Sequence, residues 1–297
     1  MKVTSSSPCR IGFFGGGSDV GEYARLHGGV CINLAINIRQ KITLDADKQE
    51  FLSGDNPVFF KSFTDLNVKH EFDGEIESGL GSSAALSVAL VGATDEIEKT
   101  NLNKYQIAEK AWDIEVNKCG LFGGRQDQLA SVFGGASLLL FEDKVYHYAL
   151  PEKKIDKITP YMALFYLGNK RKSAVIQEGL RKIDGQQKIA LDKIKDLAYE
   201  GLDAIWDGDI FTLGSLMDES WQEKKKSNKG VSNDFIGDIY LKARKNGALG
   251  GKICGSGGGG HMLFITENVE KLKNALSDLK YIPFEVDWEG LKVEVQN

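Results

Sequence analysis

The pattern of apolar and polar positions predicts strands at the beginning of the chain. Strand-length apolar runs occur at residues 10–14, 29–36 and 40–44, and a short helical pattern at residues 19–26 separates the first two. Residues 45–78 are polar and irregular, so we expect no regular element there. The chain is therefore expected to start in the order β, α, β, β.

Helical periodicity replaces the strand pattern in the next part of the chain. It extends from residue 82 to about 99 and again from 103 to 117. Asn101 or Asn103 can cap the second of these helices, because a short polar side chain accepts a hydrogen bond from a free first-turn N–H group. We therefore expect two consecutive helices between residues 82 and 117.

The second half of the chain mixes strands and helices without a regular β-α-β alternation. In chain order we expect a strand within 133–141, its hairpin partner at 144–150, a strand at 161–167, helices within 173–225, a helix from Ser232 towards residue 245, two strands flanking a glycine run at 255–260, a helix at 268–279, and short strands at 281–286 and 291–295. The predicted fold class is α+β with segregated elements.

Composition and charge restrict the kinds of partner. The 297 residues are 42% hydrophobic, which suits one large domain or two smaller ones, and the net charge of -5 favours neither nucleic acid nor a membrane surface. Four cysteines are scattered without CxxC spacing, and no apolar stretch reaches the ~20 residues that span a bilayer. We expect a cytoplasmic protein with reduced cysteines. Because its net charge is negative, any phosphate ligand must be bound by groups gathered at its own site.

The stretch SGLGSSAALSVALVGA, residues 78–93, places glycines and two serines directly before an apolar helix. The N–H groups of a helix start are unpaired and lie at the positive end of the helix dipole, which suits phosphate oxygens. A serine hydroxyl can donate to phosphate or bind Mg²⁺. The alternative is a serine-capped helix after a glycine turn. The stretch is no Walker A motif, because it lacks the GK[ST] ending.

A second motif, LFGGRQDQLASVFGG at residues 121–135, contains Arg125 and Asp127 at the start of a helical pattern. A carboxylate beside a guanidinium stays ionised and can orient or deprotonate a hydroxyl group. Asp127 can equally be a first-turn acid that stabilises its helix. Glu115, on the preceding helix, is either a metal ligand or a solvated residue.

Two further glycine clusters complete the set. Residues 255–260 read GSGGGG between two apolar runs, so close backbone approach explains the run better than a flexible tether does. Residues 10–23 read RIGFFGGGSDVGEY, where Ser18 and Asp19 can cap the short helix or bond a sugar hydroxyl.

The order RxxxxGGGSD, GLGSSAA, GGRQDQ, GSGGGG resembles the GHMP small-molecule kinases. Within them, GGGSDVGEY, GGRQDQLASVFGG and the region WQEKKK to GSGGGG look like the D-glycero-D-manno-heptose 7-phosphate kinase group. The resemblance implies a two-lobed fold, with a ribosomal-protein-S5-like lobe at residues 1–150 and a ferredoxin-like lobe at 151–297. It implies phosphorylation of the anomeric hydroxyl of a sugar phosphate, as in surface-polysaccharide precursor synthesis.

The same resemblance implies ATP and Mg²⁺ as cofactors. Ser83 and Glu115 would hold Mg²⁺. The implied nucleotide contacts are Gly79, Gly81, Ser82, Ser83, Ala84, Gly257 and Gly258. The lead-in HEFDGEIES is shorter than the segment usual in the family before GLGSSAA, so we expect a trimmed nucleotide pocket.

For the acceptor side, the resemblance implies that Asp127 deprotonates or orients the anomeric hydroxyl and that Arg10 supports transfer. The implied substrate contacts are Gly16, Gly17, Ser18, Asp19 and Arg125, with Arg171, Lys224 and Lys225 as candidates for the remote phosphate. Lysines on a helix are ordinarily solvated, which is the alternative for the last two.

Three other functions stay open at this point. The chain can be another sugar 1-kinase, of the fucose or galactose type, or an inactive sensor that binds sugar or nucleotide. A glycine-rich structural or interaction protein is the third. We expect small-molecule partners only, with a homo-oligomer possible.

Overall fold

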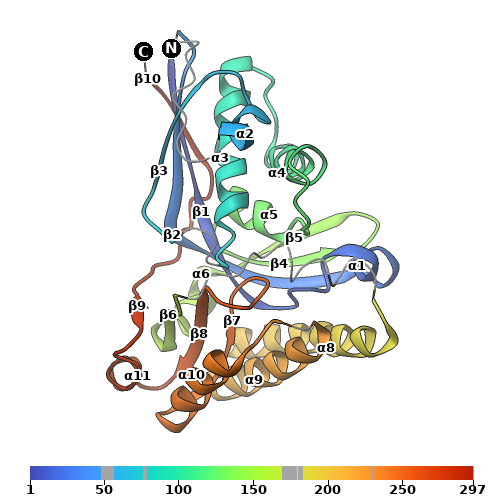
Figure 1. The fold of residues 1–297 in the computed structure, drawn as a ribbon, viewed down its shortest axis with the longest axis vertical. Coiled ribbons are helices and arrows are strands. Elements are labelled where there is room, and N and C mark those ends of the chain that lie inside the picture. Colours follow the sequence, from blue (N-terminus) through green and yellow to red (C-terminus); the bar gives the residue numbers. More distant parts are fainter. Residues whose placement is uncertain (48–56, 76–78, 169–178, 180–182, 229, 297) are drawn as a thin grey trace.

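The first sheet contains six antiparallel strands. The computed structural model describes residues 1–47, 57–75, 79–168, 179, 183–228 and 230–296 (Figure 1). The main strand order is β10-β1-β2-β4-β5, and β3 also pairs with β2. The strands are β1 (Lys2–Phe14), β2 (Gly29–Asp45), β3 (Asn67–Phe72), β4 (Ala136–Phe141), β5 (Val145–Leu150) and β10 (Lys292–Gln296).

The second sheet contains four strands in the order β7-β8-β6-β9, and its neighbouring strands are also antiparallel. They are β6 (Met162–Tyr166), β7 (Ala248–Ile253), β8 (His261–Thr266) and β9 (Lys280–Ile282). Strands and helices are therefore segregated, and the α+β class is confirmed.

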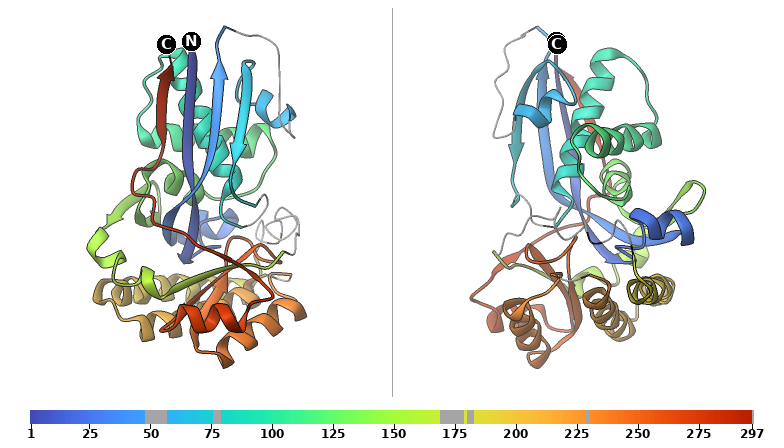
Figure 2. Two further views of the ribbon diagram at one scale, coloured as in Figure 1. Left: turned by 90° about the vertical axis from the view of Figure 1, so that its left-hand side faces the viewer. Right: turned by 45° about the vertical axis from the view of Figure 1, so that its right-hand side comes forward.

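Helices cover both sheets. Those of the first half are α1 (Gly21–His27), α2 (Pro57–Lys61), α3 (Ser82–Glu98), α4 (Lys104–Asp113) and α5 (Gln126–Phe133). Those of the second half are α6 (Glu152–Ile155), α8 (Gly185–Asp207), α9 (Ile210–Ser227), α10 (Asp234–Lys245) and α11 (Val269–Ala275). Helices α8, α9 and α10 lie at the end of the molecule opposite the two termini (Figures 1 and 2). Within the described ranges, no helix combines the length and hydropathy that crossing a bilayer requires.

The first strand is longer than the sequence pattern predicts. Strand β1 begins at Lys2, eight residues before the expected start, and its serines hide the alternation. Ser5 and Ser7 are completely buried, and the Ser7 hydroxyl donates to the carbonyl oxygen of Ala85 in α3. Small hydroxyl residues therefore occupy core positions where α3 lies close against the sheet.

Two further expectations for the first sheet are wrong. The runs 29–36 and 40–44 are one strand, β2, whose first half pairs with β4 and whose second half pairs with β3. Residues 45–78 are not wholly irregular, because α2 and β3 lie within them. Strand β3 is short and largely polar, so its buried Val68 was too little signal for a strand.

The helix boundaries follow local capping chemistry. Of the two predicted caps of α4, Asn101 and Asn103, the structure uses Asn103, which also forms a capping box with Gln106. The expected helix at 103–117 is interrupted, because α4 ends at Asp113 and a π-helical turn covers Ile114–Lys118. Such a turn is frequent at functional sites. Asp184 and Asp209 cap α8 and α9, two helices of the range 173–225 for which helices are expected.

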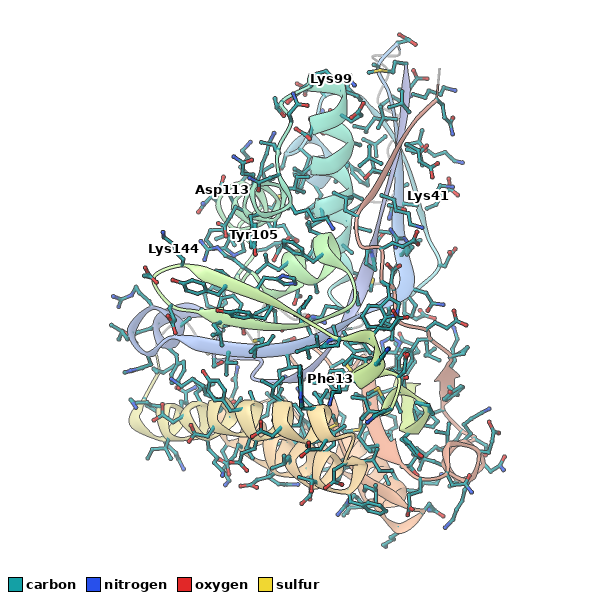
Figure 3. The ribbon with its side chains drawn as sticks, turned by 180° about the vertical axis from the view of Figure 1, so that it is seen from behind. Phe13, Lys41, Lys99, Tyr105, Asp113 and Lys144 are labelled. Atoms are coloured by element: carbon teal, nitrogen blue, oxygen red, sulfur yellow. The ribbon has the colours of Figure 1, made fainter. Side chains whose placement is uncertain are left out.

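The two sheets share one hydrophobic core. It joins residues of β1 and β2 to residues of β6, β8, α8 and α9. Phe13, near the end of β1, belongs to this core (Figure 3). Strand β10 pairs with β1, so the end of the chain returns to the first sheet. The division of lobes at residue 150 stays a prediction.

Candidate active site

The centre of the candidate site is an ion pair between Arg10 and Asp127. Arg10 donates from Nε to Oδ1 and from Nη2 to Oδ2 of Asp127, both at 2.7 Å. The Arg10 side chain is buried, whereas a quarter of the Asp127 side chain is exposed. Burial acts to lower the pKa of Arg10, but the charge and hydrogen bonds of Asp127 outweigh it and raise that pKa. The carboxylate is thus held in one orientation and still faces solvent.

A glycine loop places the start of α3 beside this pair. Arg10 Nη1 donates to the carbonyl oxygen of Gly79 at 2.6 Å. Gly81 has φ 71°, and a Cβ there would lie 3.2 Å from Asp127 Oδ2. Gly81 is also the N-cap of α3 and supplies no side-chain cap. The serine-capped alternative is therefore wrong, and the first-turn N–H groups are available to an anion.

Ser83 and Glu115 meet at the start of α3. The Ser83 hydroxyl donates to Glu115 Oε1 at 2.5 Å, and Gln128 Nε2 donates to Oε2. Burial raises the pKa of Glu115, although the bonds from Ser83 and Gln128 act to lower it and Asp127 adds to the rise. Glu115 is buried, so the solvated-residue alternative is wrong. The π-helical turn carries its carboxylate to the start of α3.

Two oxygen ligands of this kind suit Mg²⁺, which binds proteins through one or two side chains and takes its other ligands from phosphates and water. Within the described ranges no group of three or more His, Cys, Asp or Glu side chains forms a denser metal site. The residues fit a nucleotide-bound Mg²⁺ better than a metal enclosed by protein.

The glycine run at 255–260 packs against the first glycine loop. A Cβ on Gly255 would lie 2.7 Å from Gly79 Cα, so the two loops touch. Gly257 and Gly258 are buried, and the Gly258 N–H donates to the Val231 carbonyl oxygen at 2.8 Å. The run is therefore a packed loop, as close backbone approach predicts. Nucleotide contact by Gly257 and Gly258 stays a prediction.

The Asp19 carboxylate is a hydrogen-bond acceptor in the turn at residues 15–19. It accepts from the Gly17 N–H and from Gln126 Nε2, each at 3.0 Å, and burial raises its pKa. Ser18 is completely buried, and its hydroxyl donates to the carbonyl oxygens of Gly15 and Val30. These internal bonds occupy the hydroxyl and hold the turn, and contact between Ser18 and substrate stays a prediction. Gly16 and Gly17 lie in the turn, and their contact with substrate is untested.

Arg125 lies at the edge of the site. Its guanidinium stacks over Trp112 at 3.7 Å from the ring centroid and pairs with Glu109 of α4. The side chain is about one-third exposed. It is thus oriented towards α4, and a sugar contact stays a prediction.

The two lysines among the candidates for a remote phosphate have different surroundings. Lys224 is buried, and its ammonium donates to the Gly255 carbonyl oxygen at 2.5 Å. Lys225 is exposed and lies over the Trp221 ring. Arg171 lies outside the described residues. Of the two lysines, only Lys224 contacts the glycine loops.

Sequence reasoning missed three residues of the site. Gln126 and Gln128 bond Asp19 and Glu115, and both lie inside the quoted GGRQDQ motif. Lys252 is buried in β7, and a lysine within an apolar strand was the signal for it. The two glutamines are recognisable only once their partners are known.

The buried lysines predict how stability depends on pH. Burial lowers the pKa of Lys224 to about 8 and that of Lys252, with help from Lys224, to about 7. From pH 7 to 9 the unfolded chain binds more protons than the folded one, so the free energy of unfolding rises, by up to about 1.4 kcal/mol per pH unit for each lysine. Buried Cys9, Cys31 and Cys254 have raised pKa values and oppose the rise above pH 9.

Urea unfolding at pH 7 and 8.5 measures this rise, and Lys252→Met should flatten it. A free energy of unfolding that falls between these pH values in the wild type would contradict the prediction.

Comparison with known proteins gives matches over both halves of the chain. The GHMP kinases N terminal domain matches residues 51–135, and the GHMP kinases C terminal model matches residues 198–282. A D-glycero-alpha-D-manno-heptose 7-phosphate kinase from Campylobacter jejuni is 29% identical over 332 residues, covering 98% of each chain. A galactokinase from Thermotoga petrophila is 28% identical over 249 residues, covering 73% of this chain and 70% of that protein.

A solved structure has a similar fold over almost the whole chain. The crystal structure of a D-glycero-D-manno-heptose 1-phosphate kinase from Bacteroides thetaiotaomicron has a TM-score of 0.79 and 26% identity, covering 99% of both chains. The similarity therefore extends over the whole architecture that carries the site.

Proposed function

The chain belongs to the GHMP kinase family, and from that premise we propose that it phosphorylates the anomeric C1 hydroxyl of D-glycero-D-manno-heptose 7-phosphate with ATP. The product is the 1,7-bisphosphate. The observation that carries the proposal is the Arg10–Asp127 pair directly beside the glycine loop at the start of α3. An acceptor hydroxyl and a donor phosphate can meet there.

The pair supports a role in orienting the acceptor. Each Asp127 oxygen accepts one bond from Arg10, and a carboxylate oxygen has a second lone pair for a substrate hydroxyl. The hydroxyl would be held in line with the γ-phosphorus. As its oxygen bonds to that phosphorus, the bond from the γ-phosphorus to the β–γ bridging oxygen would break, ADP would leave, and the hydroxyl proton would pass towards Asp127. Arg10 lies close enough to offset negative charge that develops during transfer.

The start of α3 supports a role in holding the donor. Its first-turn N–H groups would bind phosphate oxygens, while Ser83 and Glu115 would hold Mg²⁺. When bound, Mg²⁺ neutralises charge on the β- and γ-phosphates. The Ser83–Glu115 bond must open or rearrange for both oxygens to face the cation.

The choice of sugar phosphate rests on two relatives whose names include a heptose phosphate and which align over nearly their whole lengths. Those names place the phosphate at different positions, one at C7 and the other at C1. A phosphate already at C1 would leave no anomeric hydroxyl, so the C1 transfer proposed here requires the 7-phosphate. The galactokinase relative favours a free sugar as the second candidate.

Coupled ADP release tests the proposal. The wild type is assayed with Mg²⁺-ATP against heptose 7-phosphate, heptose 1-phosphate, mannose, galactose and fucose. Turnover with the 7-phosphate alone supports the proposed substrate. Preference for a free sugar replaces the substrate but keeps the kinase, and absence of turnover with every sugar overturns the proposed activity.

Lys224 is the candidate for the remote phosphate that the site favours. We expect Lys224→Met to raise the KM for heptose 7-phosphate about tenfold or more, because an ammonium–phosphate bond would be lost in a buried setting. Lys225→Met, the neighbouring exposed lysine, is the matched control and should change KM less than twofold. Equal effects of the two variants would argue against a specific phosphate contact by Lys224.

A further inference from the structure

Lys252 is a buried lysine without a carboxylate partner among the residues that the structure describes. It is 3% exposed and lies in β7 of the second sheet. Its ammonium donates to the carbonyl oxygens of Gly12 and Phe13, at 3.0 and 2.9 Å. Both acceptors belong to the end of β1, so this side chain joins the second sheet to the first.

The contacts of Lys252 connect two parts of the candidate site. On one side, Gly12 and Phe13 lead directly into the 15–19 turn that presents Asp19. On the other side, β7 leads after Ile253 into the loop where Gly255 touches Gly79. Lys252 thus lies between the elements proposed to hold the acceptor and those proposed to hold the donor.

Stability alone does not explain a charged side chain at this position. An ammonium buried without a counter-charge costs folding free energy, and an apolar side chain of similar length would avoid that cost. The two hydrogen bonds to strand carbonyls recover part of it. What a lysine adds over a methionine is a fixed link between the end of β1 and β7.

We propose that Lys252 is a positioning residue for phosphoryl transfer, which fixes the 15–19 turn relative to the Gly79–Gly255 loop contact. The inference rests on the proposed function, and on the predicted contacts of residues 16–19 with the acceptor. Misplacement of reacting groups by about 1 Å can cost about 100-fold in rate, so a link of this kind is worth a measurable part of catalysis.

Lys252→Met tests the link, and Lys280→Met is its control. Lys280 also joins the two halves, through Glu75 at 3.2 Å, but it lies on the surface. In Lys252→Met we expect amide hydrogen exchange of residues 12–20 to be about tenfold faster, the KM for the acceptor to rise about tenfold, and the KM for ATP to stay within twofold. Lys280→Met should match the wild type in all three. Lys252→Arg, which keeps donors and charge, should recover part of the acceptor KM.

Two readouts separate this inference from the proposed function. Exchange and acceptor KM unchanged in an active Lys252→Met enzyme would overturn the positioning role alone. A merely structural role would lower the melting temperature and the active fraction while leaving acceptor KM unchanged, and it too would overturn the inference. If the wild type phosphorylates no sugar, the proposed function fails, and the exchange of residues 12–20 still decides the link. Should the methionine variant not fold, Lys252→Gln is compared in the same way.

Discussion

Asp127→Asn is expected to lower kcat by about 10²- to 10⁴-fold, the range that a positioned acid–base group contributes. Asparagine keeps the shape but removes the charge that faces Arg10, and its NH₂ group cannot accept a hydroxyl proton. ATP should still bind, because the first-turn N–H groups of α3 and the Ser83–Glu115 pair are untouched. Single-turnover phosphoryl transfer measures the chemical step, and calorimetry measures the ATP affinity.

A second partly buried arginine–aspartate pair provides the matched control. Arg39 pairs with Asp287 and also donates to the Ser6 and Gly290 carbonyl oxygens, away from the site. Asp287→Asn and Asp127→Asn each leave a guanidinium without its counter-charge, so each should cost up to about 3 kcal/mol of stability. Only Asp127→Asn should lose transfer at a temperature where both are folded. Loss of ATP binding in parallel with kcat, or a fall in kcat below tenfold, would contradict the role of Asp127.

The parts of the site that the sequence predicts are those carried by local motifs. Helix α3 begins at Ser82 as expected, because glycines and an apolar run mark its start within a few residues. Glu115 and Ser83, 32 positions apart, meet as the resemblance implies. The Arg10–Asp127 bonds join residues 117 positions apart, and no local pattern specifies their geometry. Local motifs thus identify the candidate residues, whereas the tertiary fold determines which of them pair.

The failures have physical causes of the same kind. The sequence does not show that the Ser18 hydroxyl bonds the backbone of its own turn, and whether Ser18 also contacts substrate stays a prediction. Lys252 looked like part of a buried strand. The carbonyl oxygens that accept hydrogen bonds from its buried ammonium lie some 240 positions away in the sequence. The start of β1 was missed because serines fill core positions against α3. Tertiary partners decide whether a polar residue is structural, functional or both.

Glu115→Gln is expected to raise the Mg²⁺ concentration for half-maximal activity by at least about tenfold. The amide keeps a bond with Ser83 but lacks the negative charge that a hard cation prefers. Glu98→Gln, at the exposed far end of α3, is the control and should leave the Mg²⁺ dependence unchanged. The KM for the sugar should not change in either variant, because Glu115 lies on the donor side of the site.

The environment of Glu115 adds two measurements to the same experiment. Gln128→Leu should raise the Mg²⁺ requirement less than Glu115→Gln does, because Gln128 orients the carboxylate without binding the cation itself. Since burial raises the pKa of Glu115, protonation competes with Mg²⁺, and the wild-type requirement should increase as the pH falls towards that raised pKa. Glu115→Gln should lose this pH dependence. A Glu115→Gln enzyme with wild-type Mg²⁺ dependence at every pH would show that the cation is held elsewhere.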